Sequence, residues 1–129
     1  MSEGGVISVG IDLVDVARIA RMRKSYGDSF LQRTFCDFEI DYCNKYADSD
    51  LHFAARFAAK EAVVKALKTG FTGDINLKSV AVRNSALGAP EAVLDEFAKA
   101  RLLEMGGSRV ELSLTHLRDY AQAIALVLK

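Results

Sequence analysis

The first pattern along the chain is a strict alternation near the N-terminus. Apolar residues occupy every second position there, namely Ile7, Val9, Ile11 and Leu13. This period of two predicts a β-strand over Val6 to Val14, with Asp12 on its other face. Asp15 follows as a helix N-cap, and we expect a helix from Val16 to about Tyr26. That helix is basic and carries Arg18, Arg21, Arg23 and Lys24.

The remaining patterns predict a mixture of helices and strands. We expect helices over Asp37 to Tyr46, Leu51 to Lys68 and Glu91 to Met105, and strands over Ile75 to Asn84, Arg109 to His116 and Tyr120 to Leu128. Gly70 is the expected C-cap of the long central helix, and Gly88 to Pro90 reads as a turn. The chain is therefore α+β, without an internal repeat or a linker.

The central helix carries charges on surfaces that should be buried. Phe53, Phe57 and Val64 form one stripe, and alanines cover most of the remaining circumference. Lys60 falls in the middle of the stripe, where a charge is costly unless it is paired or bound to a ligand. Arg56 and Lys60 are like charges four residues apart, whereas Glu61 and Lys65 attract each other. Structural salt bridges and an anionic-ligand site both explain this pattern.

Two carboxylates complete a possible site for a metal and a phosphate. Asp12 and Glu61 are the expected ligands, because Mg²⁺ is commonly held by one or two carboxylates with substrate phosphates and water. Arg56, Lys60 and Lys65 would then donate to the phosphate oxygens. An ordinary capping or turn role is the alternative for Asp12.

Composition narrows the class of protein. The 129 residues are half apolar, and 17 basic against 17 acidic side chains give a formal net charge of zero. We therefore expect one domain over residues 1–129, no nucleic-acid or membrane partner, and a cytoplasmic location. A near-neutral, apolar chain also favours self-association. We expect Cys36 and Cys43 to be reduced and structural.

Three segments together resemble a known family. They run from Gly10 to Ile19 (GIDLVDVARI), from Arg56 to Leu67 (RFAAKEAVVKAL) and from Leu112 to His116 (LSLTH). In this order they resemble holo-acyl-carrier-protein synthase, the short AcpS type of 4′-phosphopantetheinyl transferase. The resemblance extends over essentially the full length and includes the Gly88 to Pro90 turn. It implies an antiparallel sheet packed against a long buried helix, in protomers that assemble as homotrimers with active sites at the subunit interfaces.

The resemblance also implies a reaction. Coenzyme A would give its phosphopantetheine arm to a serine of an acyl carrier protein, with Mg²⁺ and release of adenosine 3′,5′-bisphosphate, in support of fatty acid biosynthesis. Asp12 and Glu61 would be the metal ligands, and Lys65 would contact the reacting phosphate. The serine hydroxyl needs a general base, for which Glu61 and a metal-bound water assisted by Asp12 are the alternatives. Asp15 is a possible further acceptor behind them.

Two further expectations concern coenzyme A and the carrier. His116 is in phase with the apolar positions of its strand, so it is a core residue or a contact to a coenzyme A phosphate, and less readily a base. We expect His52 to be a surface or capping residue. The acidic carrier would dock on Arg18, Arg21 and Met22, which share one helix face. A solvated charged face is the alternative for those three residues.

Two other functions use the same residues. A Mg²⁺-dependent phosphohydrolase would place water where the carrier serine attacks. A coenzyme A binding module would keep the pocket without any transfer, although retention of two costly carboxylates speaks against it. Modification of a carrier with little hydrolysis distinguishes the transferase from both.

Overall fold

The computed structural model describes residues 4–129. Its helices are α1 (Val16–Tyr26), α2 (Asp28–Thr34), α3 (Asp37–Asn44), α4 (Ser49–Ala66) and α5 (Glu96–Glu104), with a 3-10 turn at Leu77–Ser79. Its strands are β1 (Val6–Asp15), β2 (Val80–Asn84), β3 (Pro90–Leu94), β4 (Arg109–His116) and β5 (Tyr120–Leu128). No helix of this part of the chain is long and apolar enough to cross a membrane.

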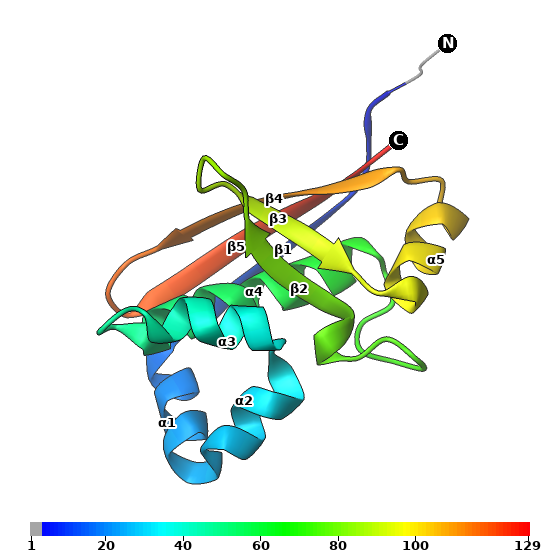
Figure 1. Cartoon of the computed structure of the whole chain (residues 1–129). Coiled ribbons are helices and arrows are strands. Elements are labelled where there is room, and N and C mark those ends of the chain that lie inside the picture. Colours follow the sequence, from blue (N-terminus) through cyan, green and yellow to red (C-terminus); the bar gives the residue numbers. More distant parts are fainter. Residues whose placement is uncertain (1–3) are drawn as a thin grey trace.

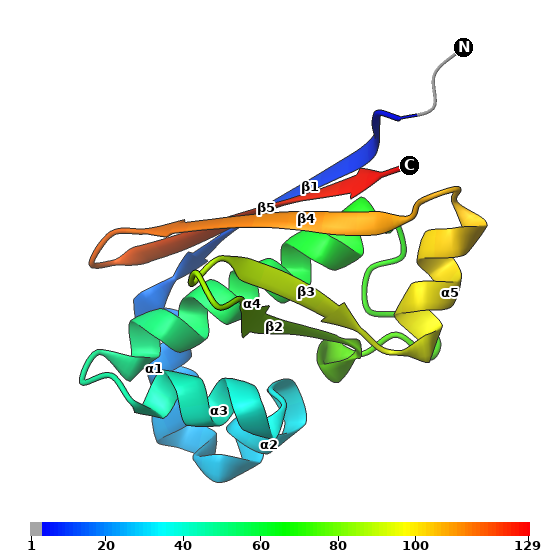
Figure 2. The same ribbon diagram turned by 45° about the horizontal axis from the view of Figure 1, so that its top comes forward.

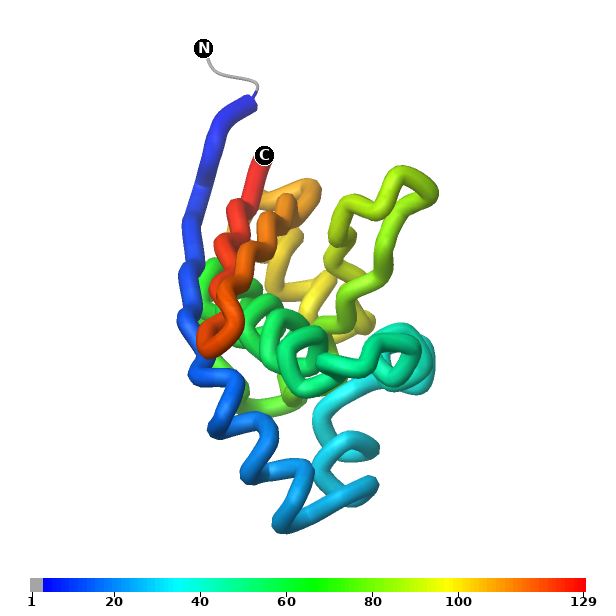
Figure 3. Tube along the Cα trace, turned by 90° about the vertical axis from the view of Figure 1, so that its left-hand side faces the viewer, coloured from blue at the N-terminus to red at the C-terminus, as the bar shows by residue number. Residues whose placement is uncertain are grey.

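The strands form two antiparallel sheets around one central helix. β1, β5 and β4 make a three-stranded sheet in that order, and β2 pairs with β3. Figures 1 and 2 show α4 running beneath the three-stranded sheet, with the β2–β3 hairpin and α5 beside it. In Figure 3, α1 continues away from the end of β1, and α2 and α3 lead back to the start of α4. The element order thus places α4 in contact with both sheets.

The face of β1 that packs on α4 is its small-residue face. Gly10 is buried there, and a Cβ on it would lie 1.9 Å from the carbonyl oxygen of Ala62. Glycine at this position therefore permits the close approach of strand and helix. The apolar side chains of the same strand point the other way, and Val9 and Leu13 remain 57% and 61% exposed. The alternation correctly predicts the strand, but Val9, Ile11 and Leu13 are exposed, and it is Val14, on the face toward α4, that is buried in the core.

Most of α4 is buried, as the apolar circumference of its sequence indicates. Phe53, Ala58, Val63 and Ala66 are all fully covered by the surrounding elements. The helix ends at Ala66 with Leu67 as its C-cap, so the predicted cap at Gly70 is wrong. Lys68 takes the left-handed conformation that turns the chain, with φ of 61°.

Two local predictions fail because tertiary pairing decides the structure. The helix predicted over Glu91 to Met105 is a strand in its first part, because Pro90–Leu94 pairs with β2. α5 begins only after Asp95, whose side chain accepts a hydrogen bond from the Ala98 backbone N–H. The predicted strand over Ile75 to Asn84 begins at Val80, after a 3-10 turn. The patterns also missed α2, which buries Phe30 and Leu31.

Candidate active site

The first cluster of functional side chains joins β1 to the C-terminal half of α4. The Nζ of Lys65 donates to Asp12 Oδ1 at 3.0 Å and to the carbonyl oxygen of Ile11 at 3.0 Å. Glu61 lies close enough to Asp12, Lys65 and Arg18 for their charges to act on it. The tight contact at Gly10 explains this geometry, because Asp12 follows two residues later on the same face of β1.

The electrostatics of this carboxylate pair favour a cation. Partial burial of Glu61 and the negative charge of Asp12 raise the pKa of the Glu61 carboxyl, and Lys65 and Arg18 act in the opposite direction. Two carboxylates are a donor set that suits Mg²⁺ when a substrate phosphate and water provide the other oxygens. Within residues 4–129 no group of three or more His, Cys, Asp or Glu residues could hold a metal without such help. The residues present therefore fit a metal that binds together with a phosphate.

Lys60 does not belong to this cluster. Its side chain is fully buried, and Nζ donates to Glu39 Oε1 at 3.0 Å and to the carbonyl oxygen of Val80 at 2.5 Å. Glu39 also accepts from the backbone N–H of Val82 at 2.9 Å. The expectation that Lys60 binds a phosphate is wrong in this structure, because a buried carboxylate and a carbonyl already occupy its ammonium group. Of the two alternatives, the structural salt bridge applies to Lys60.

Arg56 forms a second cluster, with residues of α3 and β2. Its side chain is 3% exposed, and its guanidinium lies 3.9 Å from the ring centre of Tyr42. Nη2 donates to Asn84 Oδ1 at 2.5 Å, and the buried Nε has no hydrogen-bond partner within residues 4–129. The guanidinium is thus held by an aromatic ring and a neutral amide, and its charge is not neutralised by either of them.

Two histidines and a tyrosine extend this second cluster. The ring of His52 stacks on Tyr46, with centroids 3.8 Å apart, and lies 6.1 Å from the ring of His116. Burial lowers the pKa of His52, the neighbouring Asp48 opposes this change, and the charges of Arg56 and His116 act in the same direction as burial. His116 is exposed, so the expectation of a core residue is wrong: it is the last residue of β4, and its ring lies beside that of His52 at the start of α4. The sequence patterns did not indicate Tyr42, Tyr46 or Asn84, and they suggested only a surface or capping role for His52. Tyr42 and Tyr46 stand four residues apart on α3 and the turn after it, and that spacing was the available signal.

The two clusters lie on different sides of α4. A helix turns by roughly 100° per residue, so Arg56 and Lys65, nine residues apart, point in nearly opposite directions. Arg56 contacts α3 and β2, whereas Lys65 contacts β1. The structure therefore brings Asp12, Glu61 and Lys65 together, and places Arg56 and His116 in a separate group.

The basic face of α1 adjoins the first cluster. Arg18 and Arg21 are exposed, and the Arg18 guanidinium lies 5.6 Å from the ring centre of Phe57. Met22 is half-buried and packs against the core, so it offers only part of its surface to a partner. Arg23 is held within the protein, because it donates to Asp50 at 2.7 Å and to Ser49 at 2.8 Å.

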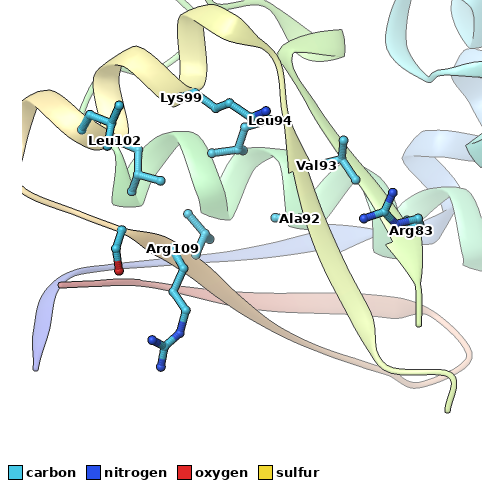
Figure 4. A pocket seen from close by; sticks show the side chains of 10 residues that line it. Arg83, Ala92, Val93, Leu94, Lys99, Leu102 and Arg109 are labelled. Atoms are coloured by element: carbon cyan, nitrogen blue, oxygen red, sulfur yellow. The ribbon is translucent and has the colours of Figure 1, made fainter. Parts of the chain in front are cut away.

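A groove of about 450 Å³ lies between β3, α5 and the start of β4. Figure 4 shows Leu94 and Leu102 beside it, with Arg83, Lys99 and Arg109 at its margins. Neither Asp12 nor Glu61 lines this groove, and the sequence analysis did not foresee it. It is therefore a surface feature separate from the carboxylate pair.

Comparison with known proteins adds the family. A sequence model of the 4′-phosphopantetheinyl transferase superfamily matches residues 8–125. The holo-[acyl-carrier-protein] synthase of Syntrophus aciditrophicus is 43% identical over 124 residues, covering 95% of each chain, and that of Geotalea daltonii is 38% identical over 122 residues, covering 95% of this chain and 96% of its own.

Solved structures agree with this similarity. The Neisseria meningitidis holo-[acyl-carrier-protein] synthase superposes with a TM-score of 0.87 at 32% identity, covering 95% of this chain and 98% of its own. The Helicobacter pylori enzyme, solved in complex with coenzyme A, gives a TM-score of 0.81 at 28% identity, covering 92% and 98%. Sequence and fold thus agree over nearly the whole chain, which belongs to the 4′-phosphopantetheinyl transferase superfamily and, within it, to the holo-acyl-carrier-protein synthase family.

Proposed function

We propose that this protein transfers the 4′-phosphopantetheine group of coenzyme A to a serine of an apo acyl carrier protein, with Mg²⁺, and so supports fatty acid biosynthesis. The observation that carries the proposal is the cluster of Asp12, Glu61 and Lys65. It lies at the two motifs through which the chain resembles the family. Relatives named holo-[acyl-carrier-protein] synthase and a structural neighbour solved with coenzyme A support the choice of substrates.

The proposed reaction is a displacement at phosphorus. The serine oxygen forms a bond to the phosphorus that carries the pantetheine arm, and the bond from this phosphorus to the bridging pyrophosphate oxygen breaks. Adenosine 3′,5′-bisphosphate leaves, and the serine proton passes to a base. Negative charge grows on the bridging and equatorial oxygens, so positive groups fixed near them lower the barrier.

Each residue of the first cluster has a proposed role. Asp12 and Glu61 would hold Mg²⁺, which supplies positive charge to the pyrophosphate oxygens when bound. The ammonium group of Lys65 donates to Asp12 and to the Ile11 carbonyl oxygen in this structure. The side chain is half-exposed, so the ammonium group can also donate to a phosphate oxygen. For the base that takes the serine proton, Glu61 and a metal-bound water assisted by Asp12 are the two candidates.

We propose that the second cluster binds a phosphate of coenzyme A in the active site of a neighbouring protomer. Among residues 4–129, the buried Nε of Arg56 has no hydrogen-bond partner and its guanidinium forms no salt bridge, and His52 and His116 lie near it. The separation of the two clusters within one chain favours a site built from two copies. The exposed apolar face of the sheet, which includes Val9, Ile11 and Ile124, offers a surface for the expected homotrimer.

The carrier is proposed to dock on α1. Arg18 and Arg21 project from the surface next to Glu61's cluster, and acidic partners are attracted to such a face. Because Met22 is half-buried, we assign it a smaller share of the contact than the two arginines.

Intact-mass spectrometry of an apo acyl carrier protein tests the reaction. The carrier is incubated with this protein, coenzyme A and Mg²⁺, with EDTA as the control. We expect a Mg²⁺-dependent gain of one phosphopantetheine group. Hydrolysis of coenzyme A without modification would favour the phosphohydrolase, and tight binding without either reaction would favour a binding module.

Mixing two inactive variants tests the shared site. Glu61→Gln and Arg56→Ala subunits are co-expressed, and the specific activity of the mixed oligomer is compared with that of each variant. If one protomer supplies Glu61 and its neighbour supplies Arg56, random assembly restores both residues at about a quarter of the interfaces. No recovery in a mixture proven to contain hybrid oligomers would place the whole site in one protomer.

Sedimentation analysis tests the assembly itself. Ile124→Asp puts a charge in the centre of the exposed sheet face, so we expect it to reduce a trimer to monomers. Leu103→Asp is the matched control, because Leu103 is 69% exposed but lies on α5. A monomeric wild-type protein at micromolar concentration would contradict the proposal.

A further inference from the structure

The amide side chain of Asn84 orients Arg56 and, being neutral, does not compensate its positive charge. Its Nη2 donates to the Oδ1 of Asn84 at 2.5 Å, and its guanidinium lies over Tyr42. Guanidinium carries five N–H donors, and the buried Nε is without a partner within residues 4–129. The group is therefore held in position by two neutral partners, and its Nε is left unsatisfied inside the described part of the protein.

The other end of the Asn84 amide is anchored in the β2–β3 turn. Asn84 Nδ2 donates to the carbonyl oxygen of Gly88 at 3.0 Å. The turn itself is closed by hydrogen bonds from Gly88 N to Ser85 O and from Ser85 N to Ala89 O, at 2.9 and 2.8 Å. Because the amide nitrogen is held by the turn, its oxygen faces Arg56.

The chemistry of the acceptor distinguishes Arg56 from other buried or half-buried cations of this protein. Lys60 is held by the carboxylate of Glu39, and Arg23 by that of Asp50. A carboxylate neutralises its partner, whereas an amide oxygen accepts a hydrogen bond and leaves the positive charge in place. An anion that reaches the guanidinium of Arg56 therefore meets a positive charge that neither Asn84 nor Tyr42 compensates.

We propose that Asn84 is a positioning residue, which uses its turn-anchored amide to aim Arg56 at a phosphate of coenzyme A. The inference rests on the proposed function, because it takes the phosphate contact of Arg56 from there. It adds a residue that touches no substrate and acts only through the guanidinium. Asn84 thus affects the binding of coenzyme A and has little influence on the chemical step.

Asn84→Ala tests the proposal through kinetics. Loss of the bond to a charged partner should raise the KM for coenzyme A about tenfold, because Arg56 then samples orientations that miss the phosphate. At saturation, kcat should change by less than about threefold, and the KM for the carrier should not move. A fall of kcat by about tenfold, with an unchanged KM for coenzyme A, would overturn the assignment. Calorimetric binding of coenzyme A and a thermal melt, run on the same preparation, separate weak binding from loss of the fold.

Asn84→Asp tests whether neutrality of the acceptor matters. The carboxylate still accepts from Arg56, but it neutralises the guanidinium and repels an anion. We therefore expect coenzyme A to bind at least as weakly as it does to Asn84→Ala. Wild-type affinity in Asn84→Asp would mean that no phosphate lies at Arg56.

Ser85→Ala is the matched control from the same turn. It removes the hydrogen bond from Ala89 N to Ser85 Oγ, which measures 3.1 Å, and it leaves the Asn84 amide in place. The KM for coenzyme A should stay within about twofold of the wild-type value. A rise as large as that of Asn84→Ala would assign the effect to a loosened turn and overturn the proposal.

A double-mutant cycle separates this inference from the function on which it rests. In an Arg56→Ala background, Asn84→Ala should have no further effect on the affinity for coenzyme A. If Arg56→Ala alone binds coenzyme A normally, the proposed role of Arg56 fails. If Arg56→Ala weakens binding but Asn84→Ala does not, only the positioning role fails.

Discussion

Two lysines of α4, five residues apart, form ion pairs in opposite surroundings. The pair between Lys60 and Glu39 is fully buried, and its atoms also bond to backbone groups of β2. The pair between Lys65 and Asp12 is open, with the Lys65 side chain 52% exposed. The same residue type on the same helix therefore forms a buried ion pair on one side and a solvent-exposed one on the other.

The two ion pairs differ in how far the charges around each lysine are balanced. Lys60 has a carboxylate and a carbonyl as partners, and burial lowers its pKa while the charge of Glu39 opposes that change. Around Lys65 two carboxylates face one exposed ammonium group, so a further cation is favoured. Closed pairs of the first kind hold elements together, and open pairs of the second kind can exchange partners with a substrate.

The largest expected effect is on stability and concerns the buried pair between Lys60 and Glu39. Lys60→Met leaves the charge of Glu39 buried without a counter-ion, with only backbone N–H groups as partners, so we expect a loss of about 3–5 kcal/mol of unfolding free energy. Lys65→Met, the same change in the exposed pair with Asp12, should lower the free energy of unfolding by less than about 1 kcal/mol. Urea denaturation of both variants measures the difference. Adding Glu39→Gln to Lys60→Met should recover part of the loss, and equal stabilities of the two lysine variants would remove the distinction between the pairs.

The next effect is on activity and concerns Glu61, which lies beside the exposed pair of Lys65 and Asp12. Glu61→Gln should keep the fold but lower Mg²⁺-dependent turnover at least about 100-fold, because one charged group that acts in the transition state is removed. Glu104→Gln is the control, since Glu104 forms an exposed ion pair with Arg101 on α5. Near-normal turnover of Glu61→Gln in the mass-spectrometric assay would exclude Glu61 as ligand and as base.

A smaller effect is expected at the docking face beside the open pair. Arg18→Glu should raise the KM for the acidic carrier about tenfold, with a much smaller change in the KM for coenzyme A. Arg18 also acts on the Glu61 charge, so Arg21→Glu is the cleaner companion variant on the same helix. Steady-state kinetics with each substrate varied in turn gives both constants. Equal changes in the two would contradict docking at α1.

The smallest effect is a shift in titration. Because burial and Asp12 raise the pKa of Glu61, metal binding should strengthen as pH rises through a range above that of an ordinary glutamate. In the metal-free protein, the pKa of Glu61 is higher in the folded state than in the unfolded state. Glu61 therefore makes its full contribution to the free energy of unfolding below the unfolded-state pKa, and this contribution is lost as pH rises through the folded-state pKa. An NMR titration of the Glu61 carboxyl carbon measures this directly. Asp12→Asn should lower the pKa of Glu61, and an unchanged value would separate the two carboxylates.

The sequence by itself determined most elements and the types of residue that carry the chemistry. Period-two and helical patterns placed β1, α1, α4, β4 and β5, and Asp15 caps α1 as predicted, accepting from Ala17 N at 2.9 Å. These features depend on neighbours within a few residues, which the local pattern contains. The pairing of Glu61 with Asp12 at one end of α4 also followed from the motifs, since the family resemblance named both residues.

Only the tertiary structure decided which faces and which partners these residues have. Nothing local shows that Glu39 neutralises Lys60 from 21 positions away, or that Asn84 meets Arg56 across 28. The alternation in β1 did not reveal that the face with Gly10 packs on α4 while Val9, Ile11 and Leu13 stay exposed. Burial, charge compensation and close backbone approach are set by segments distant in sequence, and a pattern along one segment does not contain them.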